Sequence, residues 1–162
     1  MDIREATAAD AAAIVEIYNH FILTTTISFE EEPVSDAAMR QRIAEVRDAG
    51  LPWLVATLNG KVAAFAYATK WRARPAYRFA VETSVYVHKD RAGSKLGSTT
   101  YKNLIERLRA AGLHAAIGGI ALPNEASVAL HEKMGFRKVA HFEEVGKKFD
   151  RWIDVGYWQL TL

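Results

Sequence analysis

Apolar residues recur along the chain at helical spacing in some segments and at every second position in others. Ile14, Ile17, Tyr18 and Phe21 lie three or four positions apart, so residues 8–22 are predicted to form an amphipathic helix, which the β-rich stretch 24–29 ends. Further helices are expected at 36–49, from the end of the 90–97 loop to Gly112, and from Asn124 to about Met134. Strands are expected at 2–6, 53–58, 61–69, 78–88 and 113–121, with two more in the tail 136–162.

The order of these elements indicates the fold class. Asn59-Gly60 separates two strand-like segments, and both residues tolerate positive φ, so the pair predicts a tight hairpin. Strands and helices then follow one another along the whole chain without a repeat or a long linker. This order predicts an α/β fold in which helices cover the faces of a mixed sheet.

Composition narrows the possible chemistry. A length of 162 residues fits a single domain, 1–162. The absence of cysteine excludes disulfides, thiolate nucleophiles and iron–sulfur clusters. Neither a run of about 18 apolar residues nor the basic start and apolar stretch of a signal peptide is present. We therefore expect a cytoplasmic protein with no membrane partner.

Basic residues are unevenly distributed. Residues 1–50 contain 4 Lys/Arg and 10 Asp/Glu, a net charge of −6, whereas 51–162 contain 17 and 9, a net of +8. Residues 70–109 contain 10 basic and 3 acidic residues, a net of +7. Such an excess indicates an anionic partner or a solvated face. Nucleic acid is not the expected partner, because the aromatic residues are not spaced as a stacking platform.

A glycine-bearing loop, 90–97, joins the 78–88 strand to the next helix. Backbone N–H groups at such a helix N-terminus can bind an anion, and Arg91 and Lys95 add positive charge. Ser94 and the helix residues Ser98 and Thr99 supply hydroxyl donors. The loop lacks a Walker sequence and a complete dinucleotide fingerprint. It is either a pyrophosphate site or an ordinary strand–helix turn.

A second polar motif follows about 27 residues later, within 122–136. Asn124 can cap the helix that begins there. Ser127 and His131 are four residues apart and therefore share one helix face. This face is either a solvated surface or the wall of a ligand site.

Together, the loop and the second motif resemble the Gcn5-related N-acetyltransferase (GNAT) superfamily, and the resemblance covers nearly the whole chain. Further segments resemble the phosphinothricin and methionine sulfoximine N-acetyltransferases: 19–21, 26–29, 52–56, 71–77, 81–87 and 154–160. The resemblance implies a central mixed, mostly antiparallel sheet of about seven strands, splayed at the acetyl-CoA site, with about four helices on its faces. It also implies acetyl-CoA as acetyl donor, no metal, and a homodimer.

The resemblance also implies the residues that bind the cofactor. The strand end Val85-Tyr86-Val87 would pair with the pantetheine arm, and Asn124 and Ser127 would lie near it. The pyrophosphate would bind the loop residues Ala92, Gly93, Ser94, Lys95, Leu96, Gly97 and Ser98. The loop departs from the family pattern, because Ala92 replaces a long polar residue and Lys95 replaces a glycine. Lys95 would either crowd a phosphate or pair with it.

Two residues are candidates for catalysis. Acetyl transfer needs a neutral amine, and the resemblance makes Glu82 the base that removes the proton. The alternative for Glu82 is an ion pair with Arg72, Arg74 or Arg78. His131 stands where the phosphinothricin-like branch also has histidine, and it would act as acid or base. Its alternative is a histidine with a structural role on the helix face.

The resemblance implies a small glutamate-like amino acid as substrate, acetylated on its α-amino group. Arg72 and Arg74 would hold its carboxylate, since arginine binds carboxylates through two parallel hydrogen bonds. Phe29 and Tyr77 would form walls of the pocket, beside Glu82. Other readings are acetylation of another primary amine, such as a peptide N-terminus, an aminoglycoside or a polyamine, or a non-catalytic acyl-CoA-binding module. Without cysteine, transfer must be direct from thioester to amine.

Overall fold

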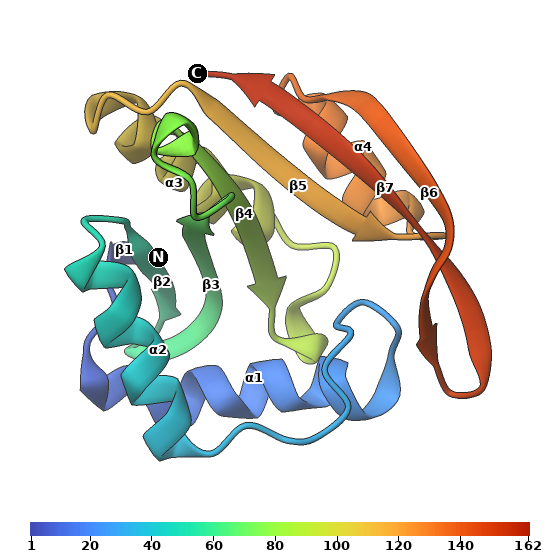
Figure 1. The fold of residues 1–162 in the computed structure, drawn as a ribbon. Helices are drawn as coiled ribbons and strands as arrows, with labels where there is room; N and C mark the ends of the chain where they lie inside the picture. The colour runs from blue at the N-terminus through green and yellow to red at the C-terminus, as the bar shows by residue number, and fades with distance from the viewer.

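A computed structural model describes residues 1–162 and shows one sheet of seven strands flanked by four helices (Figure 1). The strands are β1 (Asp2–Glu5), β2 (Trp53–Leu58), β3 (Lys61–Lys70), β4 (Ala80–Val87), β5 (Ala115–Ala121), β6 (Arg137–Lys148) and β7 (Arg151–Thr161). The helices are α1 (Ala11–Thr24), α2 (Asp36–Asp48), α3 (Leu96–Ala110) and α4 (Glu125–Lys133). This architecture confirms the predicted fold and order of elements.

The strands lie in the order β1-β2-β3-β4-β5-β7-β6, and only the β4–β5 pair is parallel. Asn59 and Gly60 have φ values of 50° and 77°, so the predicted hairpin between β2 and β3 forms as expected. The antiparallel pairs arise from short connections, whereas the β4–β5 pair needs the crossover helix α3.

Several element boundaries differ from the sequence prediction by one to three residues. Helix α1 begins at Ala11 rather than at residue 8, because Ala8–Asp10 forms a tight turn in which the carboxylate of Asp10 binds Thr7 and Arg4. The β-rich stretch 24–29 ends helix α1 at Thr24, as expected, and its remaining residues form no strand. It lies outside the sheet and pairs with none of the seven strands.

The helices cover opposite faces of the sheet. Helices α1 and α2 pack on one face, in an apolar cluster that includes Trp53 and Phe65. Helices α3 and α4 pack on the other face, where Tyr101 and Leu104 are fully buried. None of the helices is both long and apolar enough to cross a membrane.

The central feature of the sheet is a gap between β4 and β5 (Figure 1). The two strands pair only from Ala80–Glu82 to Ala115–Ile117. Beyond Glu82, β4 continues along β3 and β5 continues along β7, so that the strands separate. The splayed sheet expected from the sequence is therefore present, and the unpaired edge of β4 faces the gap.

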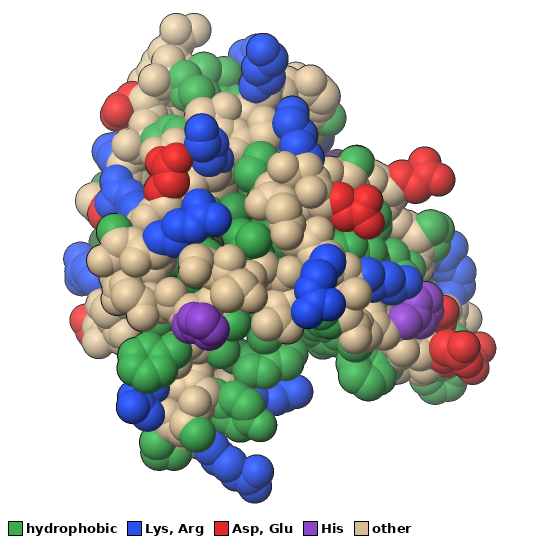
Figure 2. Space-filling model, turned by 90° about the horizontal axis from the view of Figure 1, so that it is seen from above, with side chains coloured by type: hydrophobic (Ala, Val, Ile, Leu, Met, Phe, Trp, Pro, Cys, Tyr) green, Lys and Arg blue, Asp and Glu red, His purple; other side chains and the backbone are tan.

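The surface shows no single basic stripe on the face seen from above. Figure 2 shows acidic side chains interspersed among the lysines and arginines there. The basic excess of residues 70–109 is therefore not arranged on this face as a continuous track for a long polyanion.

Candidate active site

A cleft of about 490 Å³ opens where β4 and β5 separate. Its walls come from α1, β4, the following loop and α4. Of the residues expected to bind the cofactor, the cleft is lined by Val85, Tyr86, Val87, Ala92, Gly93, Ser94, Gly97, Ser98, Asn124 and Ser127. The wall from α1 and the loop after it, formed by His20, Phe21 and Ile27, is not among the residues predicted from the sequence.

The loop before α3 is shaped to bind an anion. Gly93 has a φ of 75°, a conformation that favours glycine. Gly97 lies against β4, since a Cβ there would stand 3.0 Å from Val87 Cγ2. The N–H groups of Gly93, Lys95, Leu96, Gly97 and Ser98 have no acceptor within the protein. These free donors at the N-terminus of a 15-residue helix suit a pyrophosphate.

Two expected loop residues do not line the cleft with their side chains. Leu96 is buried in a small core cluster with Ala56 and Ala64, so only its backbone can serve the cofactor. Lys95 is exposed, and its φ of −73° is one that any residue adopts. The backbone here does not require the family's glycine, and Lys95 fits without strain.

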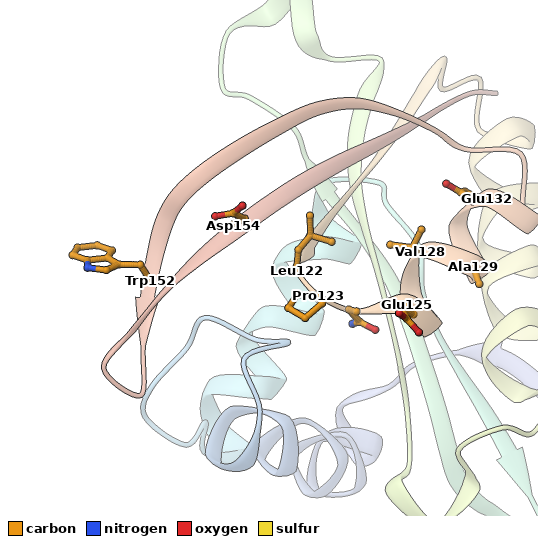
Figure 3. Close-up of a pocket in the computed structure, with 9 residues that line it drawn as sticks. Leu122, Pro123, Glu125, Val128, Ala129, Glu132, Trp152 and Asp154 are labelled. Atoms are coloured by element: carbon orange, nitrogen blue, oxygen red, sulfur yellow. The ribbon is translucent and has the colours of Figure 1, made fainter.

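A second hollow, of about 540 Å³, lies between α4 and β7 (Figure 3). Its lining includes the carboxylates of Glu125, Glu132 and Asp154. Carboxylates repel phosphate groups, whereas the cleft at the gap carries Lys89 and Arg91. The charges therefore favour the cleft at the gap for an anionic cofactor.

Glu82 is the last residue of β4 paired with β5, so it lies where the gap begins. Its carboxylate lies over Gly119 of β5, where a Cβ would be 3.6 Å from Glu82 Oε1. No salt bridge joins it to Arg72, Arg74 or Arg78, so the expected alternative of a structural ion pair is absent. Burial raises the pKa of Glu82, and the positive charge of Arg72 partly offsets this.

Tyr157 of β7 is a site residue that sequence analysis missed. Its ring lies beside Gly119, at 3.1 Å from the position of a Cβ there. Trp71 and Phe142 contact it edge to face, each with ring centroids 5.7 Å apart. Burial and the charge of Glu82 raise the pKa of Tyr157, while Arg72 lowers it. Glu82, Tyr157 and Arg72 therefore share one small region.

The other residues that were predicted to bind the substrate differ in their contacts and exposure. Arg72 stacks on Trp71, with its guanidinium carbon 4.4 Å from the ring centroid. Arg74 is exposed and makes no side-chain hydrogen bond or salt bridge. Tyr77 is 44% exposed, and Phe29 is 43% exposed with its ring directly over Gly146 of β6. Arg72 is thus connected through Trp71 to Tyr157 and the region of Glu82, whereas Arg74 has no such neighbour.

His131 does not line the cleft, and it is only 5% exposed. Its Nδ1 lies 2.8 Å from the carbonyl oxygen of Ser127, to which it donates. Its Nε2 accepts from the hydroxyl of Tyr101 at 3.0 Å, and that hydroxyl lies 2.6 Å from Thr83 Oγ1. Both ring nitrogens are thus occupied, and burial lowers the pKa of His131, which keeps the ring neutral.

No group of three or more His, Asp or Glu side chains gathers as a set of metal ligands. The free amides and the gap fit acetyl-CoA, and the reacting end would then meet Glu82. The free amides and the gap agree with acetyl transfer from acetyl-CoA to an amine.

Comparison with known proteins identifies the family. A family model described as an acetyltransferase (GNAT) domain matches residues 3–156. Phosphinothricin N-acetyltransferase of Streptomyces viridochromogenes is 42% identical over 159 residues, which span 98% of this chain and 86% of that protein. L-methionine sulfoximine/L-methionine sulfone acetyltransferase of Salmonella typhimurium is 41% identical, over 100% and 95% of the two chains.

A solved structure extends the comparison to the cofactor. The GNAT superfamily phosphinothricin acetyltransferase of Sinorhizobium meliloti, in complex with acetyl-CoA, superposes with a TM-score of 0.96 at 35% identity. The match covers 99% of this chain and 88% of that one. The chain belongs to the GNAT family and is an acetyl-CoA-dependent N-acetyltransferase.

Proposed function

We propose that this enzyme acetylates the α-amino group of a small glutamate-like amino acid of the phosphinothricin or methionine sulfoximine type. The observation that carries the proposal is the half-buried Glu82 carboxylate at the start of the gap, next to Arg72 and Tyr157. A base and a cation close together suit an acceptor that carries both an ammonium group and a carboxylate. The names of the relatives support the same acceptor class.

In the proposed reaction, Glu82 removes a proton from the α-ammonium group of the acceptor. The neutral nitrogen attacks the thioester carbonyl, and a backbone N–H near Tyr86 or Val87 stabilises the oxyanion. The tetrahedral intermediate then breaks its C–S bond and releases CoA, whose thiolate takes up the second proton lost by the nitrogen. Arg72 fixes the acceptor through its carboxylate, whereas the buried and neutral His131 supports the site without touching it.

The test is release of free thiol from acetyl-CoA with a panel of acceptors. Methionine sulfoximine, methionine sulfone and phosphinothricin are expected to be acetylated. A polyamine, an aminoglycoside and a peptide with a free N-terminus are expected to be poor acceptors. Faster turnover of any of these than of the amino acids would overturn the proposed acceptor class, and binding without turnover would indicate an acyl-CoA-binding module.

Replacing Arg72 with methionine is expected to raise the acceptor KM about ten- to a hundredfold. This range follows from the loss of one charge-assisted, two-point carboxylate contact, worth about 1.5–3 kcal/mol. Steady-state kinetics with the acceptor varied measures it. Arg78→Met is the matched control, because Arg78 stacks on Phe79 and donates to the Pro75 carbonyl. An unchanged acceptor KM in R72M would show that Arg72 does not hold the carboxylate.

Replacing Lys95 with alanine is expected to weaken acetyl-CoA binding no more than about fivefold, because an exposed ion pair contributes at most about 1 kcal/mol. Calorimetry at low and high salt measures this effect, which salt should reduce further. A gain of affinity in K95A would show instead that the side chain crowds the phosphates.

We also propose a cytoplasmic homodimer with a detoxifying role. The dimer is supported by a set of large apolar side chains exposed on β6, β7 and their connection, which are 42–61% accessible: Val139, Phe142, Val145, Phe149 and Trp152. Apolar side chains exposed together on one hairpin suit an interface between subunits. Sedimentation equilibrium tests the dimer, and a monomer at micromolar concentration would contradict it.

A further inference from the structure

The segment Thr25–Glu32, here named the acceptor loop, connects the two halves of the site. It follows α1 and runs beside the β6–β7 hairpin (Figure 1). Ile27 lines the cofactor cleft on one side. Phe29 lies over Gly146 of β6 on the other, so closely that a Cβ there would collide with the ring. The position of this loop therefore affects the space between the cofactor and the hairpin.

A buried lysine holds the acceptor loop at Ser28. Lys148, the last residue of β6, is only 3% exposed. Its ammonium donates to the carbonyl oxygens of Ile22 and Ser28, each at 2.7 Å. The Ile22 carbonyl is in the last turn of α1, where no backbone N–H reaches it and where a positive charge is favourable. Lys148 thus joins α1, the acceptor loop and the hairpin.

A second set of contacts holds the acceptor loop at Ser28 and Glu30. The guanidinium of Arg42 donates to both carboxylate oxygens of Glu30, at 2.6 and 3.0 Å. The Tyr18 hydroxyl donates to the same carboxylate and contacts Ser28 Oγ at 3.3 Å. Burial lowers the pKa of Lys148, while the carboxylates of Glu31 and Glu30 raise it. The loop is therefore fixed at two points by charged groups.

We propose that Lys148 is a positioning residue for the acceptor: it holds the acceptor loop against the β6–β7 hairpin and so shapes the acceptor site. A buried ammonium is costly to desolvate, so stability alone is a weak reason for its presence. An apolar residue would fill the space but would donate to neither carbonyl. The proposal rests on the proposed function, because it assumes that the acceptor binds beside this loop.

The test compares Lys148→Met with Lys148→Arg and with the control Lys147→Met, which removes the exposed neighbouring ammonium. In K148M the acceptor KM is expected to rise at least tenfold, with the acetyl-CoA KM changed less than threefold. K148R, which can still donate to both carbonyls, should recover part of the loss. Equal changes in both KM values, or no change in either, would overturn the proposal.

Hydrogen exchange provides a readout that does not depend on catalysis. Amides of residues 25–32 should exchange at least tenfold faster in K148M, while those of β3 and β4 stay unchanged. Unchanged exchange in the loop would overturn the proposal, even if the wild-type enzyme acetylates none of the panel. Failure of the proposed function appears separately, as absence of wild-type turnover.

A variant at the second anchor covers the case in which K148M does not fold. Glu30→Gln weakens the contact with Arg42 at a side chain that is 34% exposed, so folding should be preserved. The same selective rise of the acceptor KM is expected in E30Q, with faster exchange in 25–32. Wild-type values for both would contradict a positioning role of the loop.

Discussion

Replacing Glu82 with glutamine is expected to lower kcat by about 10²–10⁴-fold, the range typical of a lost general base. The amide keeps the size and hydrogen-bonding shape of the carboxylate but cannot take a proton. The affinity for acetyl-CoA should stay unchanged, because the substitution does not alter the loop 90–97, which would bind the pyrophosphate. Stopped assays of thiol release, with calorimetry for acetyl-CoA binding, measure the two quantities.

The pH profile gives an independent check on Glu82. The base works only when ionised, so wild-type kcat/KM should rise with pH through the pKa of Glu82, which burial places above its ordinary value. In E82Q this rising limb should disappear. Glu106→Gln is the control, because Glu106 lies on the exposed face of α3 with only a long contact to Lys102. A wild-type rate in E82Q across pH 6–9 would remove Glu82 from the mechanism.

Stability should change in the opposite sense from activity. A carboxyl whose pKa is raised by folding binds protons more tightly in the folded state, so its ionisation costs stability as pH rises past the unfolded pKa. At neutral pH the glutamine avoids that cost. E82Q should therefore melt at the wild-type temperature or slightly above it, which separates a catalytic defect from misfolding.

Replacing His131 with alanine is expected to lower the free energy of unfolding by about 3 kcal/mol. The change leaves a cavity and removes the partner of the Tyr101 hydroxyl. For a chain of this length the melting temperature should fall by about 6–12 °C. Calorimetric melting and denaturant titration measure the loss.

Activity per folded molecule then decides what His131 does. A structural histidine predicts kcat within a few-fold of wild type in H131A at a temperature where the protein remains folded. His114→Ala, at an exposed histidine that makes no side-chain hydrogen bond, controls for the loss of an imidazole. A hundredfold fall in kcat with an unchanged melting temperature would restore the acid–base role that the family resemblance implies.

The order of elements could be predicted because local signals specify it. Apolar spacing and the Asn59-Gly60 turn depend on neighbours a few residues away, and these predictions are confirmed. The stretch 24–29 has the composition of a strand and ends helix α1 as predicted, yet it forms no strand of its own. Composition alone does not determine strand pairing, because pairing depends on contacts with segments distant in sequence.

Site residues could be predicted where the site is continuous in sequence. The loop 90–97 is continuous in sequence, and most of its residues line the cleft. Tyr157 could not be predicted in this way, because its position depends on the register that places it opposite Gly119 across β5 and β7. Lys148 is harder still, since its two acceptors lie 126 and 120 residues away along the chain.

The short pairing between β4 and β5 has a mechanical consequence. The sheet consists of two antiparallel blocks, β1–β4 and β5–β7, which are joined only by the β4–β5 pairing that ends at Glu82. The pantetheine chain of acetyl-CoA, bound in the gap, would supply hydrogen bonds in place of those missing between β4 and β5. Binding of acetyl-CoA would then stiffen the connection between the two blocks next to Glu82. We therefore expect acetyl-CoA binding to prepare the site for the acceptor.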